Sequence, residues 1–276
     1  MLRTEGDEMV RDETAGDDAA RSPEFVQSLE RGLAVIRAFD QEHRSLTLSD
    51  VARETGLSRA SARRFLHTLV ELGYVATDGR EFTLRPAILD LGYAYLSSLT
   101  LPEIALPHLQ ELSQRVGESS SVAVLDGADI VYVARVATHR IMNAAIQVGT
   151  RFPAYATSMG RAVLAHAEPA VVDDYLAETT LAALTPRTVT APDRLRAVLG
   201  QVREQGWALV DQELEEGLRS VAAPLRDGAG RVVAAVNVSA PVRRGSVPEI
   251  LEHLLPPLLE AARAIEADVA RMRGTI

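Results

Sequence analysis

Two short amphipathic helices joined by a glycine strongly constrain what this chain can fold into. The first helix is expected to begin at Thr47, because Asp50 three positions later completes a capping box, and to end at Gly56. The second is expected to begin at Ser58. Its apolar residues recur every three or four positions, which places them on one helical face: Ala62, Phe65, Leu66, Leu69 and Leu72. Two such helices in tandem are typical of a helix-turn-helix.

A β-hairpin is expected directly after the second helix, in residues 74–84. β-prone runs there flank Asp78-Gly79, a common hairpin turn signal. The order predicts a winged helix-turn-helix, whose second helix enters the major groove of double-stranded DNA. A three-helix packing unit with exposed arginines is the alternative, and the hairpin at this position favours DNA binding. Hydroxyl and guanidinium groups suit base edges and phosphates, and the candidate DNA-contacting residues are Thr47, Ser58, Arg59, Ala60, Ser61, Arg63, Arg64 and Arg80.

The charge of the chain is unevenly distributed, which bears on DNA binding. The 276 residues carry a formal net charge of −9. Residues 1–24 hold three arginines against eight carboxylates and few apolar residues, so we expect a disordered acidic tail. Residues 25–86, the expected DNA-binding domain, hold nine arginines against eight carboxylates, with Arg59, Arg63 and Arg64 clustered on the second helix. The local field rather than the total charge therefore governs contact with phosphates.

The composition argues against several other classes of protein. The chain has no cysteine, which excludes disulfides and thiolate chemistry, and its six histidines lack the spacing of metal ligands. No apolar run reaches the roughly 20 residues of a membrane span, and the acidic N-terminus is no signal peptide. The motifs of serine hydrolases, zinc proteases and phosphate-binding loops are missing. We therefore expect a cytosolic protein with no membrane partner, no catalytic residues, no metal and no cofactor.

Further helices are expected on either side of the helix-turn-helix. The first begins at Ser28 and presents apolar residues on one side, which supplies the third helix of a core: Leu29, Leu33, Ile36 and Phe39. The second begins at Pro86 and is apolar over most of its surface up to about Ser98. Because such a helix must be buried, residues 87–100 are expected to form a linker that contacts a second copy of the chain. Packing against its own C-terminal domain is the alternative.

Residues 101–276 change in pattern and predict an α+β domain. A helix at 102–116 precedes two hairpins, whose strands are expected at 121–125 with 130–136 and at 223–225 with 232–238. Further strands are expected at 143–148 and 208–211, and further helices at 159–167, 169–177, 192–205 and 248–272. An antiparallel sheet with interspersed helices of this size is large enough to enclose a small-molecule cavity.

Four segments carry a family resemblance: residues 31–33, 57–69, 149–162 and 232–241. Together they resemble the IclR family of bacterial transcriptional regulators, in the expected order from about residue 25 to 272. Residues 140–142 and 149–162 are similar to the branch that controls the catabolism of aromatic acids through the β-ketoadipate pathway, which includes protocatechuate and 4-hydroxybenzoate regulators.

The resemblance implies a fold, partners and a binding site. It implies an N-terminal winged helix-turn-helix, a dimerising linker helix, and a C-terminal GAF-like α/β effector domain in a homodimer or homotetramer. The implied effector is a small organic acid of the protocatechuate, 4-hydroxybenzoate or β-ketoadipate class. The implied pocket residues are Thr157, Ser158, Met159, Gly160, Val210, Asp211, Ser220, Asn237 and Ser239. An effector from another organic-acid pathway and a constitutive architectural DNA-binding protein are the alternatives.

The chemistry of these residues suits an acid. Residues 157–160 precede a helix, whose first N–H groups favour a carboxylate, and Ser220 and Asn237 add neutral hydrogen-bonding groups. Small-oxoacid members of the family have Gly-Ala and an acidic residue where this chain has Ser158-Met159 and Val210, which favours a larger acid. The structural alternative is that Thr157 or Ser158 only caps the helix and that Asn237 and Ser239 lie on a wet sheet face. Isolated arginines are more often surface groups, so Arg135 and Arg140 are left out of the candidate site.

Overall fold

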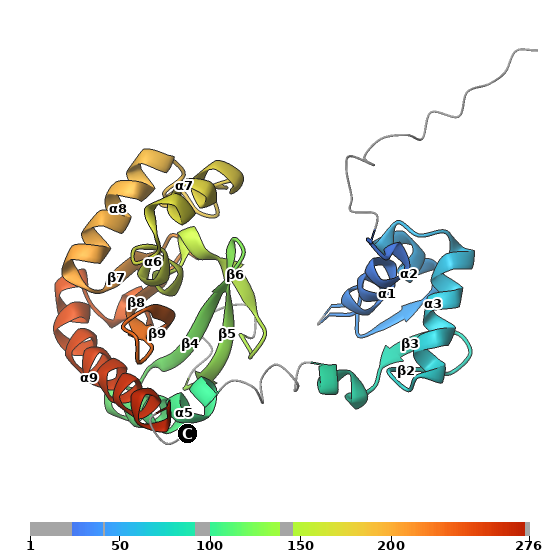
Figure 1. The fold of residues 1–276 in the computed structure, drawn as a ribbon, viewed down its shortest axis with the longest axis horizontal. Coiled ribbons are helices and arrows are strands. Elements are labelled where there is room, and N and C mark those ends of the chain that lie inside the picture. Colours follow the sequence, from blue (N-terminus) through green and yellow to red (C-terminus); the bar gives the residue numbers. More distant parts are fainter. Residues whose placement is uncertain (1–23, 41, 92–99, 139–145, 274–276) are drawn as a thin grey trace, which may run out of the picture. The chain divides into compact units, whose positions relative to one another are not determined.

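The computed structural model describes residues 24–40, 42–91, 100–138 and 146–273, which form two compact units (Figure 1). The first unit ends at Tyr93 and the second begins at Ala94. No helix within these ranges is long and apolar enough to cross a membrane. The same ranges contain no group of three or more histidines, aspartates or glutamates that could hold a metal ion.

The first unit is a winged helix-turn-helix. Its helices are α1 (Gln27–Arg37), α2 (Leu48–Thr55) and α3 (Arg59–Glu71), and its antiparallel sheet has the order β1-β3-β2, with β1 (Ser45–Thr47), β2 (Val75–Thr77) and β3 (Glu81–Leu84). Thr47 and Asp50 form the expected capping box on α2, and Gly56 ends that helix with a left-handed backbone at φ 65°. The sequence pattern did not predict β1, because three residues that pair only with the distant β3 carry too little periodicity.

The buried face of α1 differs from the expectation. Leu29 and Leu33 are 62% and 42% exposed, whereas Val35 is fully buried. A Cβ added at Gly32 would lie 3.8 Å from the ring of Phe65, so α1 and α3 approach each other at the glycine. The prediction that Leu29 and Leu33 face inward is therefore wrong, because the buried face of the helix carries Val35 instead.

Two other expectations for this unit, both concerning the ends of helices, differ from the structure. Leu72 was expected on the buried face of α3, but it is the C-cap residue and is 63% exposed. Pro86 begins a 3-10 turn, η1 (Pro86–Ile88), and residues 89–91 are helical. The continuation of the predicted linker helix through residues 92–99 lies outside the described residues, as does the acidic tail up to residue 23.

The second unit is built on one antiparallel sheet in the order β6-β5-β4-β9-β8-β7. Its strands are β4 (Ser119–Asp126), β5 (Asp129–Val136), β6 (Arg151–Pro153), β7 (Ala208–Asp211), β8 (Leu218–Arg226) and β9 (Val232–Pro241). One face packs against α5 (Thr100–Val116) and α9 (Val247–Arg273), and the other against η2 (Ala154–Ala156), α6 (Ser158–Leu164), α7 (Pro169–Glu178) and α8 (Pro192–Gln205). The turn η3 (Val242–Arg244) follows β9. The α+β prediction is confirmed.

Alternation along the strands separates the two cores. In β8, Val221 and Ala223 face α5 and α9, whereas Ala222 faces α6. Ala123 and Ala235 occupy the same α6-facing side of neighbouring strands, so small side chains let the short helix lie close to the sheet. Large aliphatic residues instead fill the face that the two long helices cover.

The chain turns at residues 147–150, at the end of the strand expected at 143–148. Residues 146–148 are not in a strand, and 143–145 lie outside the described residues. The Gln147 N–H donates to Thr150 Oγ1 at 2.9 Å, and Gly149 takes a left-handed φ of 90°. The strand that does pair with β5 is β6, which begins after this turn.

The register of the central strands places three polar residues side by side. Ser121 of β4 pairs with Arg135 of β5 on one side and with Asn237 of β9 on the other. Paired residues in an antiparallel sheet project from the same face, which here is the face covered by α6. A register shift in the β4–β5 pair, between Val122 and Ala123, brings Arg135 into this row.

Candidate effector pocket and DNA-reading helix

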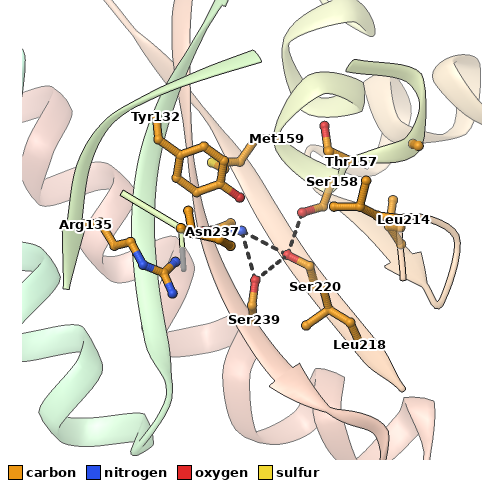
Figure 2. A pocket seen from close by; sticks show the side chains of 13 residues that line it. Tyr132, Arg135, Thr157, Ser158, Met159, Leu214, Leu218, Ser220, Asn237 and Ser239 are labelled. Carbon is orange, nitrogen blue, oxygen red and sulfur yellow. Dashed lines mark hydrogen bonds between the residues drawn. The ribbon is translucent and has the colours of Figure 1, made fainter. Parts of the chain in front are cut away.

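A cavity lies between the N-terminal end of α6 and the sheet (Figure 2). The empty space in it is about 500 Å³, a figure that includes space open to solvent. The 13 lining residues are Tyr132, Arg135, Ile146, Ala156, Thr157, Ser158, Met159, Val210, Leu214, Leu218, Ser220, Asn237 and Ser239. Apolar walls with a few polar groups are what an organic molecule with a charged or polar end requires.

Ser220 is the centre of a neutral hydrogen-bonded cluster in this cavity (Figure 2). Its Oγ shares a hydrogen bond of 2.8 Å with Ser158 Oγ. It also accepts hydrogen bonds from Asn237 Nδ2 at 3.0 Å and from Ser239 Oγ at 3.1 Å. Asn237 Nδ2 donates a second hydrogen bond to Ser239 Oγ at 3.1 Å. The cluster therefore connects α6 to β8 and β9 without placing a charge there.

Arg135 supplies the positive charge of the cavity, since none of the other lining residues is a lysine, arginine or histidine. Its Nη1 donates to Ser121 Oγ at 3.1 Å, and its Nε is buried without a hydrogen-bond partner among the described residues. Burial lowers the pKa of Arg135 and raises the pKa of Tyr132 to about 12. Near neutral pH the cavity thus presents one guanidinium and a neutral phenol.

Most of the effector-site residues predicted from the sequence come together in this cavity: Thr157, Ser158, Met159, Val210, Ser220, Asn237 and Ser239. Gly160 and Asp211 do not line it. The Gly160 N–H donates to Thr157 Oγ1 at 3.1 Å, so Thr157 caps α6 and this N–H is not left for a carboxylate. Asp211 accepts a hydrogen bond from Arg219 Nε at 2.8 Å. Asn237 is 3% exposed, which removes the alternative that it lies on a wet face.

Sequence reasoning missed the other lining residues: Tyr132, Arg135, Ile146, Ala156, Leu214 and Leu218. Arg135 is the most consequential of them, because isolated arginines usually lie at the surface and this one lies in the cavity. The hairpin turn at residues 126–129 indicates that β4 pairs with β5, but it does not predict the register shift that turns Arg135 toward the cavity. Arg140 lies outside the described residues.

The surface of α3 carries the residues predicted to contact DNA. Arg59, Ala60, Arg63 and Arg64 are exposed, and Ser61 is half-buried. Within the described part of the chain, none of these arginines forms an ion pair with a carboxylate of the first unit, so their charges face solvent.

The remaining predicted contacts have partners within the protein. Ser58 is the N-cap of α3 and accepts the Ser61 N–H at 3.2 Å. The hydroxyl of Thr47 donates to Asp50 Oδ2 at 2.6 Å, as part of the α2 cap. Arg80 is exposed at the hairpin tip, where Asp78 Oδ1 accepts its backbone N–H at 2.8 Å and fixes the turn. The wing therefore presents Arg80 on an ordered loop.

Comparison with known proteins identifies the family. The family described as the IclR helix-turn-helix domain matches residues 28–79, and the bacterial transcriptional regulator IclR C-terminal family matches residues 93–267. The chain is 48% identical to the Pca regulon regulatory protein of Pseudomonas putida over 242 residues, which cover 87% of this chain and 83% of that protein.

Solved structures agree with these matches. A crystal structure described as a transcriptional regulator of Rhodococcus sp. RHA1 is 57% identical, with a TM-score of 0.80, and covers 90% of this chain and 100% of that chain. An IclR homologue of Microbacterium hydrocarbonoxydans, crystallised with 4-hydroxybenzoate, is 29% identical, with a TM-score of 0.77, and covers 88% and 98% of the two chains. The chain therefore belongs to the IclR family of bacterial transcriptional regulators.

Proposed function

We propose that this regulator binds a small organic acid of aromatic catabolism in the cavity beside α6 and reads a palindromic operator with α3. The observation that carries the proposal is Arg135, a guanidinium with an unpartnered Nε in a cavity whose other lining residues are neutral. A carboxylate is the group that satisfies such a cation, through charge-assisted hydrogen bonds. Protocatechuate, 4-hydroxybenzoate and β-ketoadipate are the acids to test first, since relatives of this chain include a Pca regulator and a homologue crystallised with 4-hydroxybenzoate.

The proposed organisation follows the two compact units. Residues 25–86 bind DNA, residues 101–276 bind the effector, and residues 87–100 form the linker through which two copies associate as a dimer or tetramer. Two recognition helices then lie one or more helical turns apart on the operator, which requires DNA with two-fold symmetric half-sites. The regulator acts in the cytosol, where the chromosome is accessible to it.

Replacing Arg63 with alanine is expected to lower operator affinity by about 10- to 100-fold, because an exposed guanidinium on α3 contacts a base or phosphate. Gel-shift titration over a series of salt concentrations measures the effect. Arg194→Ala is the matched control, since Arg194 is an exposed arginine of α8 in the other unit and its loss changes the net charge equally. Unchanged binding by the Arg63 variant would remove this residue from the interface.

An effector at about 100 times its Kd is expected to raise the melting temperature of the full-length protein by several degrees, because it binds only the folded state. Arg135→Gln should weaken acid binding by about 10- to 100-fold, because it removes hydrogen bonds between the acid and a charged group. Arg194→Gln again serves as the control. If protocatechuate, 4-hydroxybenzoate and β-ketoadipate all leave the melting temperature unchanged, the aromatic-acid assignment is wrong. The alternative, an effector from another organic-acid pathway, is then favoured.

A further inference from the structure

A buried ion pair joins two walls of the cavity beside α6. Arg161 belongs to α6, whose first turn lines the cavity, and Glu213 belongs to the loop 212–217 between β7 and β8. The pair is bidentate: Arg161 Nη1 and Nη2 donate to the two carboxylate oxygens of Glu213 at 2.6 Å and 2.7 Å. Arg161 is 2% exposed and Glu213 is 8% exposed, so water screens the contact little. The pair therefore holds α6 and the loop in one geometry.

The loop 212–217 carries an apolar wall of this cavity. Leu214, next to Glu213 in the sequence, faces the cavity together with Ser158 of α6 (Figure 2). Val210 near the end of β7 and Leu218 at the start of β8 also line it, so the loop is flanked by lining residues on both sides. The position of the loop relative to α6 thus sets how wide the cavity is between Leu214 and Ser158.

The backbone of the loop has an unfavourable conformation at its first residue. Gln212 has a φ of 63° and is the only residue other than glycine with a positive φ among those that the structure describes. A left-handed backbone is disfavoured for a residue with a side chain and persists only where the surrounding contacts enforce it. The shape of this loop therefore depends on its partners.

The segment after α7 supplies some of these partners. Thr185 Oγ1 donates to the Gln212 carbonyl at 2.7 Å, and Thr188 Oγ1 donates to the Glu213 carbonyl at 2.7 Å. The Val189 N–H donates to Glu213 Oε2 at 2.8 Å. Glu213 is thus bonded through both its backbone and its carboxylate, and the ion pair connects this group of residues to α6.

We propose that Arg161 and Glu213 are positioning residues for the effector, because their ion pair fixes the Leu214 wall of the cavity against α6. This inference rests on the proposed function, which places an organic acid in the cavity. Neither side chain lines the cavity, so both act through Leu214 and Ser158 and not by touching the acid. Apolar packing holds the same segments together, but it is not directional, whereas two charge-assisted hydrogen bonds specify one arrangement.

The double variant Arg161→Met with Glu213→Leu separates positioning from stability. Well-packed apolar residues often replace a buried ion pair without loss of stability, but they lack its bidentate geometry. Calorimetric titration of the full-length protein with protocatechuate, 4-hydroxybenzoate and β-ketoadipate measures the effect. The acid that binds the wild type most tightly is expected to bind the double variant at least about tenfold more weakly, because the wall is no longer held in place.

Leu258→Ala is the control for lost stability. Leu258 is fully buried in the core between the sheet and the helices α5 and α9, on the face opposite the cavity. Its truncation destabilises the same unit by leaving a void. Acid affinity in this variant should stay within about threefold of the wild type, since the cavity walls are unchanged. A loss as large as that of the double variant would mean that acid binding follows stability and would overturn the positioning role.

Amide hydrogen exchange in the unliganded protein tests the loop without any acid. The Gln212 N–H donates to the Leu218 carbonyl at 2.8 Å and closes the loop. Peptides that cover residues 212–218 are expected to exchange at least about tenfold faster in the double variant, while peptides from β4 and β9 keep the wild-type rate. Exchange as slow as in the wild type would show that the ion pair does not hold the loop and would overturn the inference.

The outcomes separate this inference from the proposed function. Faster exchange with unchanged acid affinity overturns the role in binding, while acid binding and the proposed function stand. If none of the three acids binds the wild type, the proposed function fails and the positioning role fails with it. Where the double variant does not fold, Glu213→Gln gives the same two readouts, because its amide nitrogen cannot accept a hydrogen bond from Arg161. Wild-type affinity in folded Glu213→Gln likewise overturns the inference.

Discussion

Replacing Glu213 with alanine is expected to lower the free energy of unfolding of the second unit by about 3–5 kcal/mol. Its carboxylate accepts hydrogen bonds from Arg161 Nη1 at 2.6 Å and Nη2 at 2.7 Å, and from the Val189 N–H at 2.8 Å. Arg161 is 2% exposed. Within the described residues, the variant leaves this buried guanidinium bonded to the Tyr155 carbonyl alone, and an uncompensated buried charge is the costly state.

Urea unfolding followed by the fluorescence of Trp207, the single tryptophan of the chain, measures this effect in the second unit. The double variant Arg161→Met with Glu213→Leu removes both charges and is expected to stay within about 1 kcal/mol of the wild type, since well-packed apolar residues often replace a buried ion pair without loss. A Glu213→Ala protein that unfolds at the wild-type urea midpoint, with an unchanged slope, would contradict the prediction.

Replacing Gly160 with alanine is expected to lower the stability of the second unit by about 3 kcal/mol or more, or to prevent its folding. A Cβ at this position would lie 2.2 Å from the carbonyl oxygen of Ala154 and 2.4 Å from its Cα. Both atoms belong to the backbone of η2, so no side-chain rotation relieves the overlap, and the overpacking cost lies at or above its usual range of about 1–3 kcal/mol.

The sign of this effect distinguishes it from an ordinary helix substitution. Glycine to alanine inside a helix normally stabilises by about 1 kcal/mol. Gly200 of α8 offers that comparison, because a Cβ there meets nothing within 4 Å. Gly200→Ala should therefore raise the urea midpoint while Gly160→Ala lowers it. A Gly160→Ala protein as stable as the wild type would mean that η2 and α6 are not packed as closely as described.

Residues that start or end helices through their own backbone geometry explain what the sequence predicted well. The helix expected at 192–205 is α8, bounded by Pro192 and the left-handed Gly206, and the strand expected at 208–211 is β7. Proline and glycine act through their own backbone geometry, so these boundaries need no knowledge of the rest of the fold. The same holds for the capping box at Thr47. The candidate pocket residues, by contrast, followed from family resemblance rather than from periodicity.

Non-local geometry explains what the sequence could not predict. Strict alternation from Tyr132 places Arg135 on the opposite face of β5. The register shift beside Ala123 restores both residues to the α6-facing side, and only the folded sheet reveals it. Gly160 is a second case, since its spacing in the sequence carries no sign that Ala154 lies against it. Likewise, the closeness of Gly32 to the ring of Phe65 joins two helices and cannot be read from the spacing of residues in α1.

The enclosure of α6 has a mechanical consequence for the regulator. All seven residues of this helix, Ser158–Leu164, are buried, so it has no side facing solvent. Close-packed interiors have little free volume to absorb a displacement. A molecule that pushes on Ser158 therefore cannot be accommodated by the helix alone: any movement must be shared with η2, α8 and the strands β8 and β9 that surround it. A ligand that displaced Ser158 would therefore act on this whole layer rather than on α6 alone.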